Sequence, residues 1–397
     1  MQFISEIKDL IKEVKMLKFN DNGKFRIMQI SDTQDTQFTS KNTVEFIAAA
    51  LDREKPDLVV FTGDQVKGYG TFLAVGNRDK NTEKTIRNLL KPLAERNTPF
   101  TFVFGNHDAQ AFGSSKEKQY KVYKSYPSCL AQRGEKELAG LCNHNLEIKG
   151  SKSDKTVFNI YLIDSLSATP SGKCDHVTEG QLKWYQKTRD RLKQENGEYI
   201  KSLVFQHIPV PEIWHLLKQV PKSKIPHAAG YGDYLGKYYD IDADYLIKGD
   251  CDFLLETPGT PDENSGEFDV LREKGDVLGM FFGHDHNNSF VGEFMGMKMG
   301  YAQGVGFNVY GPYMKRGVRI IDLDENNLNT FSTHTLLYED IFEFKDIHQK
   351  ARYLFYSWSP PSPQVAVPIV KKLVPASLGL MAGLAVYKTA VKKRRRF

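Results

Sequence analysis

The chain has 397 residues, of which 40% are hydrophobic and 26% are charged. This composition is typical of a globular protein, and the length is sufficient for one large domain or two average ones. The formal net charge is +5, but residues 392–396 are all basic, and the remaining 49 Lys and Arg equal the 49 Asp and Glu. A neutral body argues against the broad basic surface of a nucleic-acid-binding protein, so no nucleic-acid partner is expected. The four cysteines have no C-x-x-C spacing and are expected to be reduced thiols.

The first expected element is an amphipathic helix over residues 1–20. Charged residues recur throughout this stretch, which therefore does not resemble a secretory signal, and its acidic residues argue against a transit peptide. Its aliphatic residues fall at helical spacing, at Ile4, Ile7, Leu10, Ile11 and Val14.

Residues 21–347 have the pattern of a mixed α/β domain. Short apolar runs rich in Val, Ile and Phe predict buried strands at 25–30, 58–62, 100–104, 157–163, 203–205 and 277–282. Amphipathic helices are expected at 43–53 and 84–96, and this alternation of strand and helix predicts a largely parallel sheet. Three later strands, at 290–294, 298–301 and 317–322, are expected to form an antiparallel meander. The two longest connections, 120–153 and 213–271, are expected to cover the functional site or extend the surface.

The last 50 residues are expected to lie outside this domain. Residues 348–372 include the sequence Ser-Pro-Pro-Ser-Pro and predict a stiff linker. Residues 373–391 are predicted to be a C-terminal transmembrane anchor, because 373–387 are uncharged and basic residues flank the stretch on both sides. Residues 392–397 form a basic tail. The alternative is an amphipathic or disordered tail, which would leave the protein in the cytoplasm rather than on the cytoplasmic face of a membrane.

Five short segments with metal-binding residue types follow the predicted strands. In open α/β sheets the carboxyl ends of the strands are where ligands bind. Carboxylate, amide oxygen and imidazole groups suit Zn, Mn or Fe. The segments are Ser31-Asp32-Thr33-Gln34, Gly63-Asp64, Gly105-Asn106-His107-Asp108, Gln206-His207 and Gly283-His284-Asp285-His286.

In their order these motifs resemble the calcineurin-like metallophosphoesterase superfamily, whose pattern is D-x-H, G-D, G-N-H-[D/E], a lone His and G-H-x-H. The resemblance covers about residues 24–323. The runs around His207 and His284 are similar to the branch that contains Dcr2-like phosphatases and purple-acid-phosphatase-like proteins. The resemblance implies a four-layer sandwich of two mixed β-sheets flanked by helices.

The resemblance also implies roles for the site residues. Two divalent or trivalent ions (Mn, Zn or Fe) would share Asp64 and activate a water between them. The ligands of the first ion would be Asp32, Gln34 and His286, and those of the second Asn106, His207 and His284. His107 would be the general acid, with Asp108 orienting its imidazole.

Two positions depart from the family pattern. Gln34 stands where the family usually has His, and a neutral amide is a weaker donor, so the first ion is expected to be loosely held. Asp35 is then a candidate substitute ligand or a residue supporting the ligands. Lys67 stands where purple acid phosphatases carry Tyr, which excludes a tyrosinate–iron colour and leaves Lys67 as a candidate phosphate contact.

The sequence therefore predicts a hydrolase acting on phosphoric ester bonds, with a phosphate monoester of a small molecule or phosphoprotein as the favoured substrate. Two alternatives remain open. One is a phosphodiesterase or nuclease of the same superfamily. The other is a catalytically weak, membrane-tethered scaffold in which the first metal site has decayed at Gln34.

Overall fold

A computed structural model of the chain describes residues 16–69, 76–111, 113–168, 174–230, 232–343 and 350–351. Most of the helix expected over 1–20 lies outside these ranges, and so do the anchor at 373–391, the basic tail and all but two residues of the linker. The end of that predicted helix is wrong, because Leu17–Lys18 form a short strand instead. No helix in the described ranges combines the length and the apolar character needed to cross a bilayer.

The described residues form five α-helices and seventeen strands, several of which are only two residues long. The helices are α2 (Lys41–Glu54), α4 (Arg78–Glu95), α5 (Lys116–Lys124), α6 (Glu179–Asn196) and α7 (Glu267–Arg272). The strands are β1 (Leu17–Lys18), β2 (Lys24–Ile30), β3 (Leu58–Thr62), β4 (Phe100–Val103), β5 (His144–Lys149), β6 (Thr156–Leu162), β7 (Ser202–Phe205), β8 (Leu217–Val220), β9 (Ala228–Ala229), β10 (Tyr238–Ile241), β11 (Phe253–Leu254), β12 (Val277–Phe282), β13 (Asn288–Ser289), β14 (Val291–Phe294), β15 (Met297–Tyr301), β16 (Gly317–Asp324) and β17 (Ser332–Leu337).

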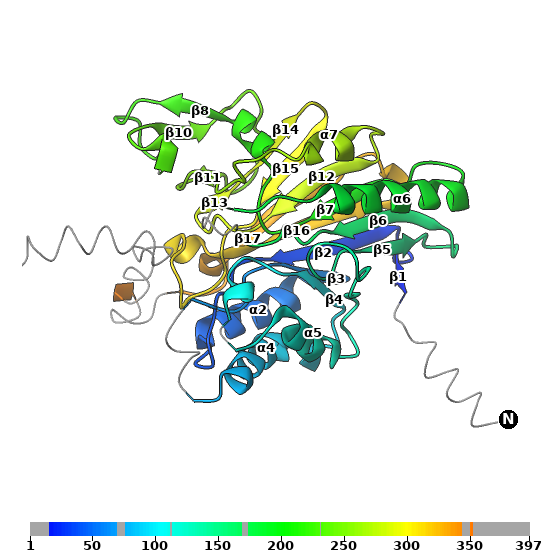
Figure 1. Cartoon of the computed structure of the whole chain (residues 1–397), viewed down its shortest axis with the longest axis horizontal. Coiled ribbons are helices and arrows are strands. Elements are labelled where there is room, and N and C mark those ends of the chain that lie inside the picture. Colours follow the sequence, from blue (N-terminus) through cyan, green and yellow to red (C-terminus); the bar gives the residue numbers. More distant parts are fainter. Residues whose placement is uncertain are drawn as a thin grey trace, which may run out of the picture. The chain divides into compact units, whose positions relative to one another are not determined.

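Two mixed sheets form the centre of the fold. The first has the strand order β17-β16-β2-β3-β4, with β2, β3 and β4 parallel. The second has the order β1-β5-β6-β7-β12-β15-β14, with β6, β7, β12 and β15 parallel. In Figure 1, α2, α4 and α5 lie on the outer side of the first sheet, and α6 and α7 lie on the outer side of the second. The expected four-layer sandwich is confirmed.

Alternation along the strands explains this layering. In β2 and β3, Ile27 and Val60 point into the core between the sheets, whereas Met28 and Phe61 point into the core under α2 and α4. Side chains of a strand alternate between its two faces, so a strand that is apolar at every position must be covered on both. All four cysteines are free thiols, as expected.

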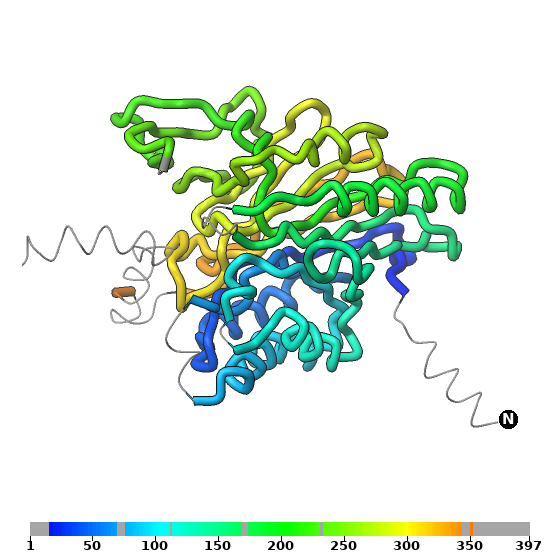
Figure 2. Tube along the Cα trace, in the orientation of Figure 1, coloured from blue at the N-terminus to red at the C-terminus, as the bar shows by residue number. Residues whose placement is uncertain are grey.

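The predicted antiparallel meander is only partly correct. Strands β14 and β15 do pair antiparallel, but β15 also pairs parallel with β12, and β16 belongs to the other sheet, between β2 and β17. The two long connections are not plain loops either. Residues 120–153 include the end of α5 and all of β5, and residues 213–271 carry the small sheet of β8, β10 and β9, which stands apart from the large sheets at the upper left of Figure 2.

Candidate metal centre

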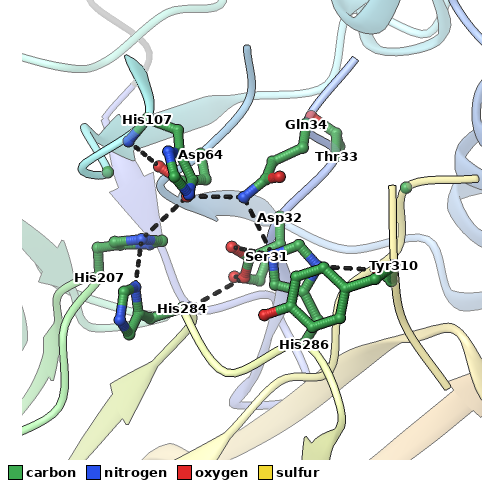
Figure 3. Close-up of polar contacts among 12 residues, drawn as sticks. Ser31, Asp32, Thr33, Gln34, Asp64, His107, His207, His284, His286 and Tyr310 are labelled. Carbon is green, nitrogen blue, oxygen red and sulfur yellow. Dashed lines mark hydrogen bonds and ion pairs between the residues drawn. The ribbon is translucent and has the colours of Figure 1, made fainter. Parts of the chain in front are cut away.

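The loops that follow β2, β3, β4, β7 and β12 come together at one end of the two sheets. These strands are parallel within each sheet, so their carboxyl ends lie at the same edge. The Nδ1 atom of His207 lies 2.8 Å from the carbonyl oxygen of Thr62, which joins the loop after β7 to the end of β3 in the other sheet. Asp32 and His284, 252 positions apart in the chain, thus meet in one cluster (Figure 3).

One group of donors, here meaning atoms that can coordinate a metal ion, is formed by Asn106, His207 and His284. The Oδ1 atom of Asn106 lies 3.0 Å from His207 Nε2 and 3.0 Å from His284 Nδ1, and the two ring nitrogens are 3.3 Å apart. Asp64 Oδ2 completes the group at 3.4 Å from His207 Nε2. Three sequence-predicted residues and the predicted bridging carboxylate therefore converge on one point.

A second group is formed by Asp32, Asp64 and His286, each of which is buried and offers one ligand atom within 4.8 Å of the others. Asp32 Oδ1 lies 3.2 Å from His286 Nε2. Asp64 Oδ2 belongs to both groups, because it also faces His207. This shared position is the one that the sequence analysis assigned to a bridging ligand.

The hydrogen bonds of the histidines test whether the two groups suit a cation. The Nδ1 atoms of His207 and His286 lie 2.8 Å and 2.9 Å from the carbonyl oxygens of Thr62 and Tyr310, so each Nδ1 carries the hydrogen and each Nε2 presents a lone pair. Asp32 Oδ1 is buried without a hydrogen bond and faces the lone pair of His286. Two acceptors facing each other are unfavourable unless a proton or a metal cation lies between them, so the donor set fits a metal centre.

Electrostatics at Asp64 point the same way. Burial alone would favour the neutral acid, but the imidazoles of His207 and His107 hold the pKa of Asp64 well below its usual range. Burial lowers the pKa of His207, yet the carboxylate of Asp64 outweighs it and raises that pKa to about 10. A buried carboxylate that stays ionised requires a compensating positive charge. When no metal ion is bound, a proton on Nε2 of His207 supplies that charge, and a bound cation would take the place of this proton.

Gln34 lies in the cluster, but its amide nitrogen faces the other residues. Its Nε2 atom donates to Asp64 Oδ2 at 2.8 Å and lies 3.1 Å from His286 Nε2, as Figure 3 shows. Its Oε1 atom accepts a hydrogen bond from the hydroxyl group of Tyr69 at 2.8 Å. Gln34 was expected to coordinate through its amide oxygen, but in this structure that oxygen is turned away from the cluster.

His107 lies at the rim of the site with 13% of its side chain exposed. Its backbone N–H donates to Asp64 Oδ1 at 2.8 Å, and its Nε2 lies 3.9 Å from Asp64 Oδ2. Its Nδ1 lies 2.8 Å from Gln110 Oε1, and its ring packs against the ring of Tyr69. The imidazole therefore presents Nε2 toward the cluster while Gln110 fixes the other nitrogen.

The expectation that Asp108 orients His107 is wrong. The carboxylate of Asp108 is fully buried and accepts hydrogen bonds from the backbone N–H groups of Asp64, Val66 and Gly105. Burial, and then the charge of Asp64, raise the pKa of Asp108 to about 7. Asp108 thus ties two of the site loops together, and Gln110 has the role that was expected of Asp108.

Asp35 and Lys67 both make hydrogen bonds within the protein. Asp35 accepts hydrogen bonds from the backbone N–H groups of Thr36 and Ser40 and from the amide of Asn308, so it holds the loop before α2 and does not replace a ligand. Lys67 donates to the carbonyl oxygen of Asn308 at 3.0 Å. Its ammonium group is therefore engaged by the protein backbone.

Close packing explains the glycines before the ligands. A Cβ atom on Gly105 would lie 2.1 Å from Asp64 Oδ1, and one on Gly283 would lie 2.0 Å from Ser31 Oγ. Left-handed backbone conformations at Asp32, Gln34, Asp64 and His284 accompany this packing. Such conformations are costly for residues other than glycine and concentrate at functional sites.

Three residues that support the site were not predicted from the sequence: Tyr69, Gln110 and Tyr310. The ring of Tyr310 stacks on His286 at 4.0 Å, and its hydroxyl group bonds to Glu256. A glycine-rich turn near residue 304 lies beside the site, where Gly304 N–H donates to the carbonyl oxygen of His286. This turn could have indicated Tyr310 from the sequence, because it carries the chain from β15 past the cluster.

Comparison with known proteins agrees with the geometry. Residues 25–288 match the family model of the calcineurin-like phosphoesterases. Probable inactive purple acid phosphatase 29 of Arabidopsis thaliana is 28% identical over 79% of this chain and 80% of its own length. Phosphatase DCR2 of Saccharomyces cerevisiae is 26% identical over 83% of this chain and 57% of its own length. A crystal structure of a dimetal phosphatase from Danio rerio aligns with 79% of this chain and 99% of its own, at 14% identity and a TM-score of 0.47.

Proposed function

This chain belongs to the calcineurin-like phosphoesterase family, whose members hydrolyse phosphoester bonds, and we propose that it hydrolyses a phosphate monoester with the help of two bound metal ions. The observation that carries the proposal is the pair of donor groups that share Asp64 Oδ2. When bound, two such cations polarise the phosphate and lower the pKa of a water between them.

Some residues of the chain would hold the two cations, and others would orient the residues that hold them. Asp32 and His286 would hold one cation, Asn106, His207 and His284 the other, and Asp64 both. The backbone carbonyls at Nδ1 of His207 and His286 orient these rings and increase the basicity of Nε2. Asp64 would be held for this role by two hydrogen bonds. The N–H of His107 donates to its carboxylate, and its own backbone N–H donates to Asp108.

His107 would act as the general acid. Its Nε2 faces the cluster, its Nδ1 is held by Gln110, and part of the side chain is open to solvent. A group in this position can protonate the leaving oxygen of the ester. Burial lowers the pKa of His107, with the Asp64 carboxylate opposing that effect.

A monoester is favoured over a diester for two reasons. The relatives that match most of this chain include one named a phosphatase and one named a probable inactive purple acid phosphatase. In addition, residues 1–391 carry no net formal charge, which argues against the salt-sensitive binding of a nuclease. Either a small phosphorylated molecule or a phosphoprotein would satisfy this chemistry.

The test is hydrolysis of an aryl phosphate monoester and the corresponding diester by the full chain. The protein is stripped of metal and titrated with Mn, Zn and Fe beside Asp64→Asn. Metal-dependent turnover of the monoester that is lost in Asp64→Asn supports the proposal, and preferential turnover of the diester favours a phosphodiesterase. Tight metal binding without turnover of either ester favours the scaffold, in line with the relatives named probable inactive.

We also propose that residues 373–391 attach the enzyme to a membrane, with the catalytic domain in the cytoplasm. The uncharged stretch 373–387 and its basic flanks support this. The full chain should resist alkaline extraction from cell membranes, whereas a chain ending at residue 372 should be released. Equal release of both forms would contradict the anchor.

A further inference from the structure

We infer that Tyr69 is a positioning residue that holds Gln34 as a hydrogen-bond donor to the ligands of the first cation rather than as a ligand itself. The first cation would then bind more weakly than the second. This inference rests on the proposed two-ion function.

The orientation of the Gln34 amide is the central observation. Its Nε2 atom is within hydrogen-bond distance of Asp64 Oδ2 and His286 Nε2, at 2.8 Å and 3.1 Å. Both of these atoms belong to the donor group of the first cation. An amide coordinates a metal ion through its oxygen, whereas its N–H groups can only donate hydrogen bonds. In this orientation Gln34 competes with a cation for the same lone pairs.

Tyr69 fixes that orientation. Its hydroxyl group donates to Gln34 Oε1 at 2.8 Å, which keeps the oxygen on the side away from Asp64. Rotation of the amide would break this bond and would place Oε1 against the carboxylate oxygen of Asp64, so that two acceptors would face each other. Gln34 is 1% exposed, and a buried polar group left without its partner is destabilising.

Tyr69 is itself held in place at the site. Its ring centroid lies 4.3 Å from that of His107, and the Lys67 ammonium group lies 5.4 Å from the Tyr69 ring centroid. These two neighbours hold the ring in the position from which its hydroxyl group reaches Gln34. Tyr69 connects the Gln34 amide to the residue proposed as the general acid.

The two cation positions consequently differ in their ligands. The second has Asp64, Asn106, His207 and His284, all facing one point. The first has Asp32, Asp64 and His286, and Gln34 Nε2 contacts two of these three. Loss of the Tyr69 hydroxyl group would free the amide to rotate and present its oxygen as a fourth ligand.

Titration of the full, metal-stripped chain with Mn²⁺ tests this inference. Isothermal calorimetry gives the two affinities, and electron paramagnetic resonance distinguishes an isolated Mn²⁺ from a spin-coupled pair. The wild-type chain should bind one equivalent tightly and a second more weakly. In Tyr69→Phe the second affinity should rise about tenfold, the scale on which residues that support metal ligands act, and the coupled signal should appear at lower Mn²⁺. Gln34→Ala should bind the second equivalent no more weakly than wild type.

The control is Tyr245→Phe, which removes a hydroxyl group from a tyrosine that packs on Phe294, outside the site, and should leave both affinities unchanged. Two equally tight sites in the wild-type chain, or no change in Tyr69→Phe, would overturn the inference. A weaker second site in Gln34→Ala would also overturn it, by showing that Gln34 is a ligand. Absence of any Mn²⁺ binding, with Zn²⁺ and Fe²⁺ equally inert, would instead refute the proposed two-ion function on which it rests.

Discussion

At the scale of single residues, we expect His107 to transfer a proton without binding a metal ion. Its side chain faces the cluster, but its ring nitrogens contact Gln110 and Asp64 rather than the histidines of the cation groups. Replacement by alanine should therefore lower kcat about 10²- to 10⁴-fold, the usual contribution of a general acid, and leave metal content unchanged. Steady-state kinetics together with elemental analysis of the metal-loaded protein measure both quantities.

The leaving group provides the control for this prediction. A nitrophenolate leaves without protonation, so His107→Ala should lose less activity on nitrophenyl phosphate than on an alkyl phosphate. Gln110→Ala removes one exposed hydrogen bond and should cost less than about tenfold, since such a bond contributes about 1 kcal/mol. An equal loss on both esters would indicate that His107 holds the phosphate instead of protonating the leaving oxygen.

At the scale of elements, the turn after β4 depends on the absence of a side chain at residue 105. A Cβ atom there would meet both Oδ1 and the backbone nitrogen of Asp64, at 2.1 Å and 2.4 Å, and neither can move without disturbing the loop after β3. Gly105→Ala should therefore destabilise the fold by about 1–3 kcal/mol, the usual cost of overpacking, and weaken metal binding.

Gly180 is the matched position for this substitution. It lies near the start of α6, and the atoms nearest to a Cβ added at this residue would be 3.8 Å and 4.0 Å away, which is ordinary contact. Gly180→Ala should be neutral or stabilise the protein by up to about 1 kcal/mol, because alanine favours the helix. Urea unfolding of the two variants compares them, and a Gly105→Ala protein as stable as Gly180→Ala would exclude the proposed clash.

At the scale of the whole molecule, the elements that could be predicted from the sequence are those whose signals lie within a short stretch of it. Strands β3 and β12 have the bounds expected from their apolar runs, because Gly63 and Gly283 end both runs in the sequence as well as in the structure. Helix α6 was missed although Thr178 and Gln181 form a capping box at its start. The pairing of β16 with β2 had no local signal, since these strands lie near opposite ends of the domain's sequence.

The residues of the candidate site could be predicted from the sequence, whereas the residues that support them could not. The residue types of the proposed metal ligands stand in short motifs at strand ends, where parallel topology brings them together. Whether Asp108 or Gln110 faces the His107 imidazole depends on the backbone turn between them, and Tyr69 reaches Gln34 only because two loops from neighbouring strands lie together. Such contacts are determined by loop conformation, which spacing in the sequence does not specify.

Metal binding should stabilise the entire domain. The donor groups join loops from both sheets, and they are brought together only in the folded chain, so ions that bind there favour folding by RT ln(1 + [L]/Kd), or about 4 kcal/mol at a thousandfold excess over Kd. Removal of metal with a chelator should lower Tm in a thermal unfolding scan, and added Mn²⁺ should restore it. Asp64→Asn should respond little to either treatment, whereas an equal response would place the stabilising ions elsewhere.

The buried side chain of His144 makes stability depend on pH. It is neutral in the fold, with Nδ1 2.6 Å from the carbonyl oxygen of Cys142 and Nε2 2.8 Å from Thr101 Oγ1. Burial lowers its pKa to about 4, whereas the unfolded chain has the ordinary value of about 6.5. Below pH 6.5 the unfolded state therefore gains a proton that the folded state does not, and stability falls until about pH 4.

This single group should remove roughly 2–3 kcal/mol of the free energy of unfolding between pH 6.5 and 4, according to the size of its pKa shift. His144→Gln cannot take up that proton, so the variant should be less stable than wild type at pH 7.5 and should approach or exceed it near pH 4. Urea unfolding across this pH range measures the difference in stability between the two proteins. The carboxylic acids are the same in both, so their titration does not contribute to that difference. A difference that stays constant with pH would mean that the His144 imidazole is protonated within the fold, despite facing the side chain of Thr101 and the backbone of Cys142.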